Sequence, residues 1–127
     1  MFDAKEIDLS QYEAESSFHD ATGAGRGYAC AGGVAEAIEK CINEYYPDVE
    51  VSIEHAEGLA ECKKTLTLAK AGRLNGCLIE GMGCPGGCIA GAGTNIPVLK
   101  AKKDLAAYVK NSTTPIPPKE LEEIELE

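Results

Sequence analysis

Two cysteines in a glycine-rich segment are the residues of this chain best suited to chemistry. Cys84 and Cys88 lie four positions apart within EGMGCPGGCIAGAG, residues 80–93, which also holds six glycines. Thiolates are soft ligands for iron, zinc and copper. Glycines let the backbone approach a large group closely and present its N–H groups to anionic atoms. The segment therefore indicates a site for a metal or a bulky cofactor.

The spacing and number of the thiols restrict what that cofactor can be. A structural zinc site needs four ligands and a cubane iron–sulfur cluster needs four thiolates, so this pair supplies half of either set. A nucleotide loop is disfavoured, because GAGRGY at residues 23–28 departs from the G-x-G-x-x-G spacing. A thiol redox switch is conceivable, but its signature has two residues between the cysteines, and this loop has three.

Composition predicts one soluble domain in a reducing compartment. The 127 residues, 44% of them hydrophobic, suffice for a single core, and the net charge of −9 argues against nucleic acid and membrane surfaces as partners. No apolar run is long enough to span a membrane, and the start of the chain lacks the pattern of a signal peptide. We therefore expect a cytoplasmic protein, in which the six cysteines serve metal or redox chemistry rather than disulfides.

Hydrophobic periodicity predicts the elements that position the loop. Apolar residues at helical spacing indicate helices over residues 31–46, 59–71 and 97–110, the last with Pro97 in its first turn and Thr94 or Asn95 as the cap. Alternation predicts a strand over residues 49–54, and an apolar run predicts a buried strand over residues 77–79. Strand, helix and strand in this length predict a right-handed parallel βαβ unit, with the loop at a carboxyl end, where ligands bind.

The other thiols and charged residues have simpler interpretations. Cys41, Cys62 and Cys77 fall on predicted core faces, which suits small buried side chains. Cys30 is evenly balanced between a structural residue and part of a backbone-lined pocket. The sequence also suggests that two histidines and several charged side chains lie at the surface: His19, His55, Lys100, Lys102 and Lys103.

The glycine segment resembles a signature of the iron-only hydrogenases, written roughly as E-x-M-x-C-x-x-G-C-x-x-G-x-G. Its fixed positions are Glu80, Met82, Cys84, Gly87, Cys88, Gly91 and Gly93. A second match, ATGAGRGYACAGGVAEAI at residues 21–38, is similar to the family segment that precedes this signature. The resemblance covers about residues 20 to 110, and the two motifs occur in the family's order.

The resemblance implies a cofactor and residue roles. The family's H-cluster joins a four-iron cubane to a two-iron unit that carries CO and cyanide. By this resemblance Cys84 would ligate the cubane and Cys88 would bridge the cubane and the two-iron unit. Met82 would pack beside the cluster, Gly87 and Gly91 would line it, and the role of Glu80 is left open. No residue of this chain is assigned a catalytic role.

Two family signatures that supply the remaining ligands and the proton-relay cysteine are absent from the sequence. The resemblance therefore implies a fragment of an iron-only hydrogenase catalytic domain, which in its parent helps hold the H-cluster for reversible H2 oxidation and is inactive alone. Its partners would be the rest of that catalytic domain and a ferredoxin-like electron carrier. The alternatives are a non-catalytic iron–sulfur or H2-sensing relative, and an interaction domain that binds no metal.

The expected organisation has three parts within an α/β fold that belongs to a larger catalytic domain. Residues 1–27 form an irregular acidic lead-in, residues 28–111 form the α/β fragment that binds the H-cluster, and residues 112–127 form a disordered acidic tail. The last two residues, Leu126 and Glu127, resemble the remnant of an expression tag.

Overall fold

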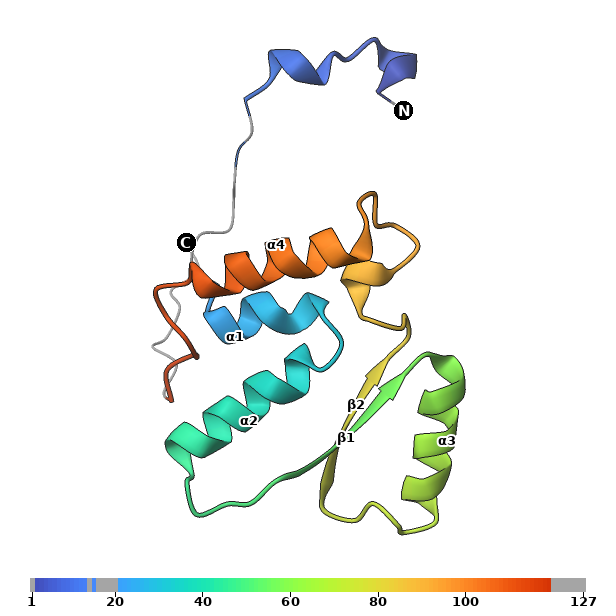
Figure 1. The fold of residues 1–127 in the computed structure, drawn as a ribbon, viewed down its shortest axis with the longest axis vertical. Coiled ribbons are helices and arrows are strands. Elements are labelled where there is room, and N and C mark those ends of the chain that lie inside the picture. Colours follow the sequence, from blue (N-terminus) through green and yellow to red (C-terminus); the bar gives the residue numbers. More distant parts are fainter. Residues whose placement is uncertain (1, 14, 16–20, 120–127) are drawn as a thin grey trace.

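The computed structural model describes residues 2–13, 15 and 21–119. Within them a small sheet and four α-helices are joined by short 3-10 helices (Figure 1). In chain order the elements are η1 Asp3–Lys5, η2 Leu9–Gln11, α1 Gly23–Arg26, η3 Gly27–Ala29, α2 Gly33–Tyr45, β1 Ser52–Glu57, α3 Leu59–Lys70, β2 Cys77–Met82, η4 Cys88–Ala90 and α4 Val98–Lys110.

The sheet is the parallel βαβ unit that periodicity predicts, so the α/β fold class is confirmed. Strands β1 and β2 pair in parallel from Ser52 opposite Cys77 to Glu57 opposite Met82. Helix α3 makes the crossover and contacts both strands, while α2 contacts β2 from the other side (Figure 1). The cysteine loop leaves the carboxyl end of β2, the edge at which open α/β sheets bind ligands.

The strand boundaries differ from the sequence-based expectation. Strand β1 begins at Ser52 instead of residue 49, because the chain first turns after α2 with a hydrogen bond from Val49 N to Tyr46 O. Val49 is accordingly half exposed. The fully buried side chain of the strand is Ala56, so the apolar alternation upstream marked an exposed connection. Strand β2 runs on to Met82 and carries the glycine segment into the sheet.

Helix α1 lies in the segment that we expected to be irregular. Its sequence, GAGR, has little helix propensity. Thr22 caps it by accepting a hydrogen bond from Gly25 N, and its first N–H groups, those of Gly23 and Ala24, donate to carbonyls at residues 114–115. Contacts from distant residues therefore stabilise a helix that local propensity does not predict.

Helix α4 begins one residue later than expected and without the predicted cap. Pro97 is the cap residue itself, and no side chain satisfies the first N–H groups of the helix. The hydroxyl of Thr94 donates instead to Cys88 O. Thr94 therefore stabilises the cysteine loop rather than the helix.

The start of the expected tail is held against the body. Ser112 Oγ donates to Ala21 O, and Tyr45 Oη donates to Pro117 O at 2.6 Å. These contacts extend the organised part of the fragment beyond residue 111. The rest of the expected tail, residues 120–127, and the lead-in residues Ser16, Ser17 and His19 lie outside the described residues.

The core is thin for a chain of this length. The buried apolar residues among those described are Ala24, Ala35, Ala37, Ala56 and Ala101, and no large side chain there is fully buried. Large apolar side chains lie at the surface instead, among them Leu99 at 83% exposed and Leu59 at 79%. Such a surface favours burial against further protein.

The N-terminal segment stands apart from the body in Figure 1. Phe2, Leu9 and Tyr12, in or beside its two short helices, are exposed. The side chain of Asp8 accepts hydrogen bonds from Ser10, and these lower the pKa of its carboxyl group. No hydrogen bond joins residues 2–13 or 15 to the loop that carries the cysteines.

No helix in the described part of the chain combines the length and the apolar character needed to cross a membrane.

Candidate metal centre

Cys84 and Cys88 lie on the loop between β2 and α4. Both side chains are exposed and neither forms a disulfide. Cys84 precedes a tight turn in which Gly87 N donates to Cys84 O, and Cys88 begins η4. Two free thiols on a hydrogen-bonded loop at the carboxyl end of a sheet are positioned to bind a soft metal.

Gly87 is required by the protein itself. It is buried and has φ +90 and ψ −172, a conformation open essentially to glycine alone. A Cβ placed on it would lie 2.5 Å from Ala29 O and 2.5 Å from Ala31 N. The loop is therefore packed backbone to backbone on residues 29–31. Gly87 thus has a structural role within the chain, and its expected place beside a cofactor stays a prediction.

Gly91 brings the backbone close to the cysteine sulfur. A Cβ at this position would lie 3.3 Å from Cys84 Sγ and 3.3 Å from Cys88 O. Gly83 and Gly93 differ, because a Cβ built on either would meet no atom within 4 Å. The loop thus combines glycines that permit packing with glycines that leave open space beside the thiols.

Hydrogen bonds from three directions hold the loop. Gly86 N donates to Glu57 Oε2 at 2.7 Å, and Ala31 N donates to Gly86 O at 3.3 Å. On the far side the Thr94 hydroxyl bonds to Cys88 O. The loop is therefore attached to β1, to the start of α2 and to the connection before α4.

Glu80 is a buried carboxylate at the centre of this arrangement. It is 8% exposed, its Oε1 accepts a hydrogen bond from Val34 N at 3.2 Å, and its Oε2 lies 3.0 Å from His55 Nδ1. The histidine ring is half exposed, as expected for a surface residue, but it has this buried partner. One side chain thereby joins β2, β1 and the N-terminus of α2.

Met82 ends β2 and lines a cavity of about 220 Å³ between β2 and α2, together with Val34 and Ile38. Its carbonyl accepts a hydrogen bond from Gly58 N at 2.7 Å. Cys62 lies beneath this strand end, with its Sγ 3.5 Å from Ala56 O. Its half-buried thiol faces backbone carbonyls.

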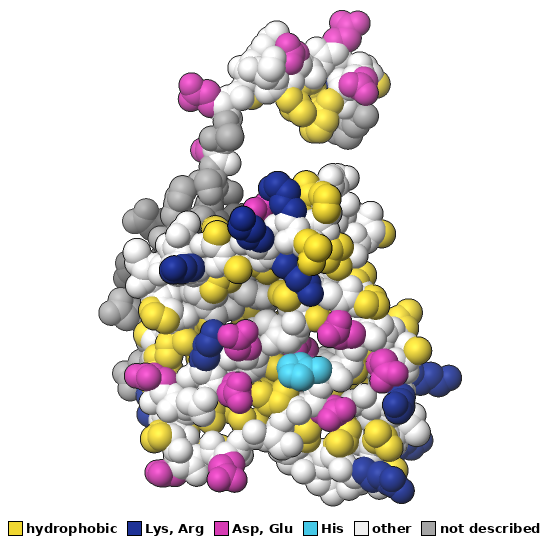
Figure 2. All heavy atoms as spheres, viewed as in Figure 1, with side chains coloured by type: hydrophobic (Ala, Val, Ile, Leu, Met, Phe, Trp, Pro, Cys, Tyr) yellow, Lys and Arg dark blue, Asp and Glu magenta, His cyan; other side chains and the backbone are white. Residues whose placement is uncertain are grey.

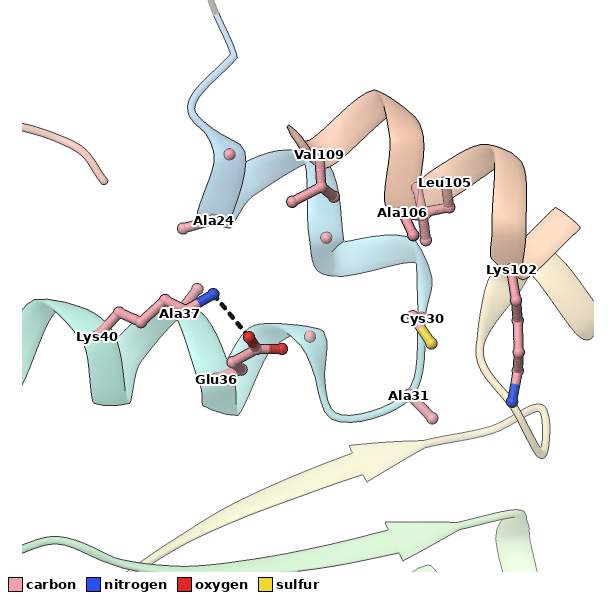
Figure 3. Close-up of a pocket in the computed structure, with 13 residues that line it drawn as sticks. Ala24, Cys30, Ala31, Glu36, Ala37, Lys40, Lys102, Leu105, Ala106 and Val109 are labelled. Carbon is pink, nitrogen blue, oxygen red and sulfur yellow. Dashed lines mark ion pairs between the residues drawn. The ribbon is translucent and has the colours of Figure 1, made fainter. Parts of the chain in front are cut away.

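Cys30 lies beside the loop, but its thiol lines a separate cavity. The cavity holds about 280 Å³ between α1, α2 and α4, and Figure 3 shows Cys30 and Lys102 at one end of it and the Lys40–Glu36 ion pair at the other. Its walls are mostly glycine and alanine. The backbone of Cys30 nevertheless borders Gly87, because the carbonyl carbon would lie 2.7 Å from a Cβ there.

The thiols do not gather into a complete ligand set. Cys41 and Cys77 are half buried, as Cys62 is, and each lies on a different element. Within residues 2–13, 15 and 21–119, no group of three or more His, Cys, Asp or Glu side chains could hold a metal ion. The described chain alone therefore provides the pair Cys84 and Cys88.

Comparison with known protein families gives a match that covers most of the chain. A family model described as "iron only hydrogenase large subunit, C-terminal domain" matches residues 1–92. The chain belongs to this family. Within the iron-only hydrogenase match lie β1, β2, the cysteine loop and the N-terminal segment, while α4 lies beyond it. The match reaches further towards the N-terminus than the resemblance in the two motifs, which begins near residue 20. No curated protein matches the chain.

Membership in the iron-only hydrogenase family implies that the parent large subunit is an iron-dependent oxidoreductase with an iron–sulfur cofactor. Two residues beside the loop had no role in the sequence interpretation. The sequence assigns no role to Glu57, which follows the predicted strand, and it predicts only that His55 lies at the surface. The available signals were a histidine one residue and a carboxylate three residues beyond the end of the predicted strand, and both depend on the strand register.

Proposed function

We propose that this chain supplies two thiolate ligands, Cys84 and Cys88, to the H-cluster of an iron-only hydrogenase. The observation that carries the proposal is the pair of free, exposed thiols on one hydrogen-bonded glycine loop of a family member. In the bound cofactor, the metal centre supplies the chemistry of reversible H2 oxidation. This chain contributes ligands and backbone, and it has no activity alone.

The residue roles follow the family signature. By that signature Cys84 would be a thiolate ligand of the cubane, Cys88 would be a thiolate ligand shared with the two-iron unit, and Met82 would lie beside the cluster. The backbone at Gly87 and Gly91 would line the cluster, as the family signature implies. The close approach of Gly91 to Cys84 Sγ supports this assignment, because a side chain there would press on the ligand atom.

The remaining ligands come from the rest of the catalytic domain. A cubane needs four thiolates, and the loop carries two, Cys84 and Cys88. The thin alanine core and the exposed Leu59 and Leu99 support the same partner, because their burial against further protein would complete a core of ordinary size.

An acidic, ferredoxin-like electron carrier is the second proposed partner. Lys100, Lys102 and Lys103 are exposed on α4, next to the exposed Leu99. Basic side chains gather over this part of a protein whose net charge is −9 (Figure 2). A positive patch beside an apolar side chain, close to the loop, fits a negatively charged carrier.

Iron binding tests the proposed function. The chain is reconstituted anaerobically with iron and sulfide, alone and mixed with a polypeptide that bears the two absent signatures. We expect wild type and a Cys41→Ala/Cys77→Ala control to bind iron in the mixture, and a Cys84→Ala/Cys88→Ala variant to bind none. Equal iron in that variant and the wild type, or no iron in any mixture, would contradict the proposal.

Infrared spectra of the iron-loaded mixture distinguish a catalytic hydrogenase from a non-catalytic or H2-sensing relative. Bands of bound CO and cyanide support the H-cluster after maturation. A cubane without such bands would favour a non-catalytic or H2-sensing relative.

A further inference from the structure

Two carboxylates bracket the cysteine loop, and neither has been given a function. Glu57 is the last residue of β1, and its Oε2 accepts a hydrogen bond from Gly86 N. Glu80 lies within β2 opposite His55 in the register of the sheet. Both side chains act at points where the loop or its strand meets residues 29–34.

Glu80 provides at the start of α2 the hydrogen-bond acceptor that an N-cap side chain would otherwise supply. The helix begins after Gly32, whose φ is +87, and at Gly33, where a Cβ would lie 2.0 Å from Gly27 O. Glycine is therefore needed at both positions, and Gly32 makes no side-chain capping hydrogen bond. The carboxylate of Glu80 accepts from Val34 N instead, and its negative charge is favourable at a helix N-terminus.

Burial makes the partners of Glu80 necessary. A carboxylate withdrawn from water costs free energy unless it is hydrogen-bonded. Val34 N and His55 Nδ1 meet its two oxygens, which fixes β2 against α2 four residues before Cys84. Strand β2, which leads into Cys84, is thereby fixed in position relative to α2.

Glu57 acts on the loop itself. Its bond to Gly86 N orients a peptide group whose other side, Gly86 O, accepts from Ala31 N. The next residue, Gly87, packs on the backbone of Ala29 and Ala31. A charged acceptor on β1 thus directs the loop onto the same short segment that precedes α2.

We propose that Glu57 and Glu80 are positioning residues that hold the cysteine loop in its metal-receiving conformation before any metal is bound. The proposal rests on the proposed function for its purpose, but the positioning itself is a property of the metal-free chain. In this role neither carboxylate is a metal ligand or a proton carrier, because Glu57 acts through Gly86 N and Glu80 acts through Val34 N and the His55 ring.

The test measures amide hydrogen exchange in the metal-free 127-residue chain at Ala31 and Gly87. These N–H groups bond to Gly86 O and Cys84 O, so neither contacts the carboxylates directly. We expect Glu57→Ala and Glu80→Ala to speed exchange at both sites by about tenfold, the scale of one lost hydrogen bond to a charged group. Glu57→Gln and Glu80→Gln retain an acceptor oxygen and should stay within about threefold of wild type.

Glu54→Ala is the matched control, since it makes the same change on β1 away from the loop, and it should leave both rates unchanged. Unchanged exchange in the two alanine variants would overturn the proposal. It would also be overturned if α3 amides such as Leu68 lost protection by the same factor, because the effect would then be global unfolding. A glutamine variant as impaired as its alanine counterpart would mean that the retained acceptor oxygen does not position the loop, and this would also overturn the proposal.

Iron binding in the mixture described above is measured on the same variants. Wild type without iron would overturn the metal function while leaving the exchange result intact. Wild type with iron and normal exchange in the alanine variants would overturn positioning while leaving the metal function intact. The two ideas therefore fail separately.

Discussion

Gly87→Ala is the substitution for which the structure gives the sharpest expectation. The backbone conformation at this residue is costly for any residue with a Cβ, at roughly 1–3 kcal/mol. The new methyl group would also lie 2.5 Å from Ala29 O and Ala31 N, so one of the two segments must move, at about 1–3 kcal/mol for overpacking. Together these effects predict a loss of roughly 2–6 kcal/mol, a large part of the stability of an ordinary domain.

Urea unfolding followed by far-ultraviolet circular dichroism measures this loss. With a slope of about 1–3 kcal/mol per molar urea, a loss of 3 kcal/mol lowers the midpoint by roughly 1–3 M. Gly83→Ala and Gly93→Ala are the matched controls, because both lie in the same loop region, neither has a positive φ, and a Cβ there meets nothing within 4 Å. We expect the controls to change stability by less than about 1 kcal/mol.

A Gly87→Ala midpoint equal to that of Gly83→Ala would refute the reasoning. It would mean that the loop is not packed on residues 29–31 in solution. An intermediate outcome, in which the midpoint falls less than expected but stays below that of Gly83→Ala and Cys84 and Cys88 are alkylated faster, would mean that the loop has moved away as a unit and that the strain was relieved locally.

Further expectations concern other parts of the chain. Gly33→Ala should unfold the chain at a lower temperature than any of the loop variants, because its Cβ would lie 2.0 Å from Gly27 O; thermal melts check this, and a melting temperature near wild type would contradict it. Tyr45→Phe removes the hydrogen bond to Pro117 O and should cost about 0.5–1.5 kcal/mol. Limited proteolysis should then cut residues 112–119 sooner, and equal cleavage rates would argue against the contact. Lys100→Ala breaks an exposed ion pair with Asp104 and should change stability by less than about 0.5 kcal/mol in urea unfolding, with a larger loss counting against a simple surface pair.

The parts of the fold that the sequence predicts are those encoded by local pattern. The helical stripe from Val34 to Tyr45 and the order of strand, helix and strand gave the parallel unit, and the glycine segment was expected at its carboxyl end. The signature residues predicted which loop carries the candidate ligands Cys84 and Cys88. These features depend on periodicity and spacing, which a single sequence displays directly.

The parts that the sequence does not predict depend on contacts between distant residues. Helix α1 forms in GAGR because carbonyls from residues 114–115 accept its first N–H groups. The contact between Glu80 and Val34 N joins positions 46 residues apart, and the bond from Gly86 N to Glu57 joins positions 29 apart. Neither pairing has a local signature, because each follows from the register of β1 and from the packing of α2.

The role of each glycine also depends on contacts that the sequence does not display. Their number suggested space for a bulky cofactor, and at Gly83 and Gly93 the backbone does border open space. Gly87 and Gly33 are instead explained by neighbouring backbone of the same chain. The glycine content indicates that the backbone closely approaches other groups, but only the structure shows which group lies against each glycine.

The contact between the two ends of the fragment body has a consequence for protein engineering. Ala21 O accepts from Ser112, and Gly23 N donates to Thr114 O, so the chain enters and leaves the body at one place (Figure 1). A short peptide could join these points, and new termini could open at the exposed turn around Gly76, where a Cβ would meet nothing. The circularly permuted chain would begin at β2, and the loop that carries Cys84 and Cys88 would be among the first residues to be synthesised.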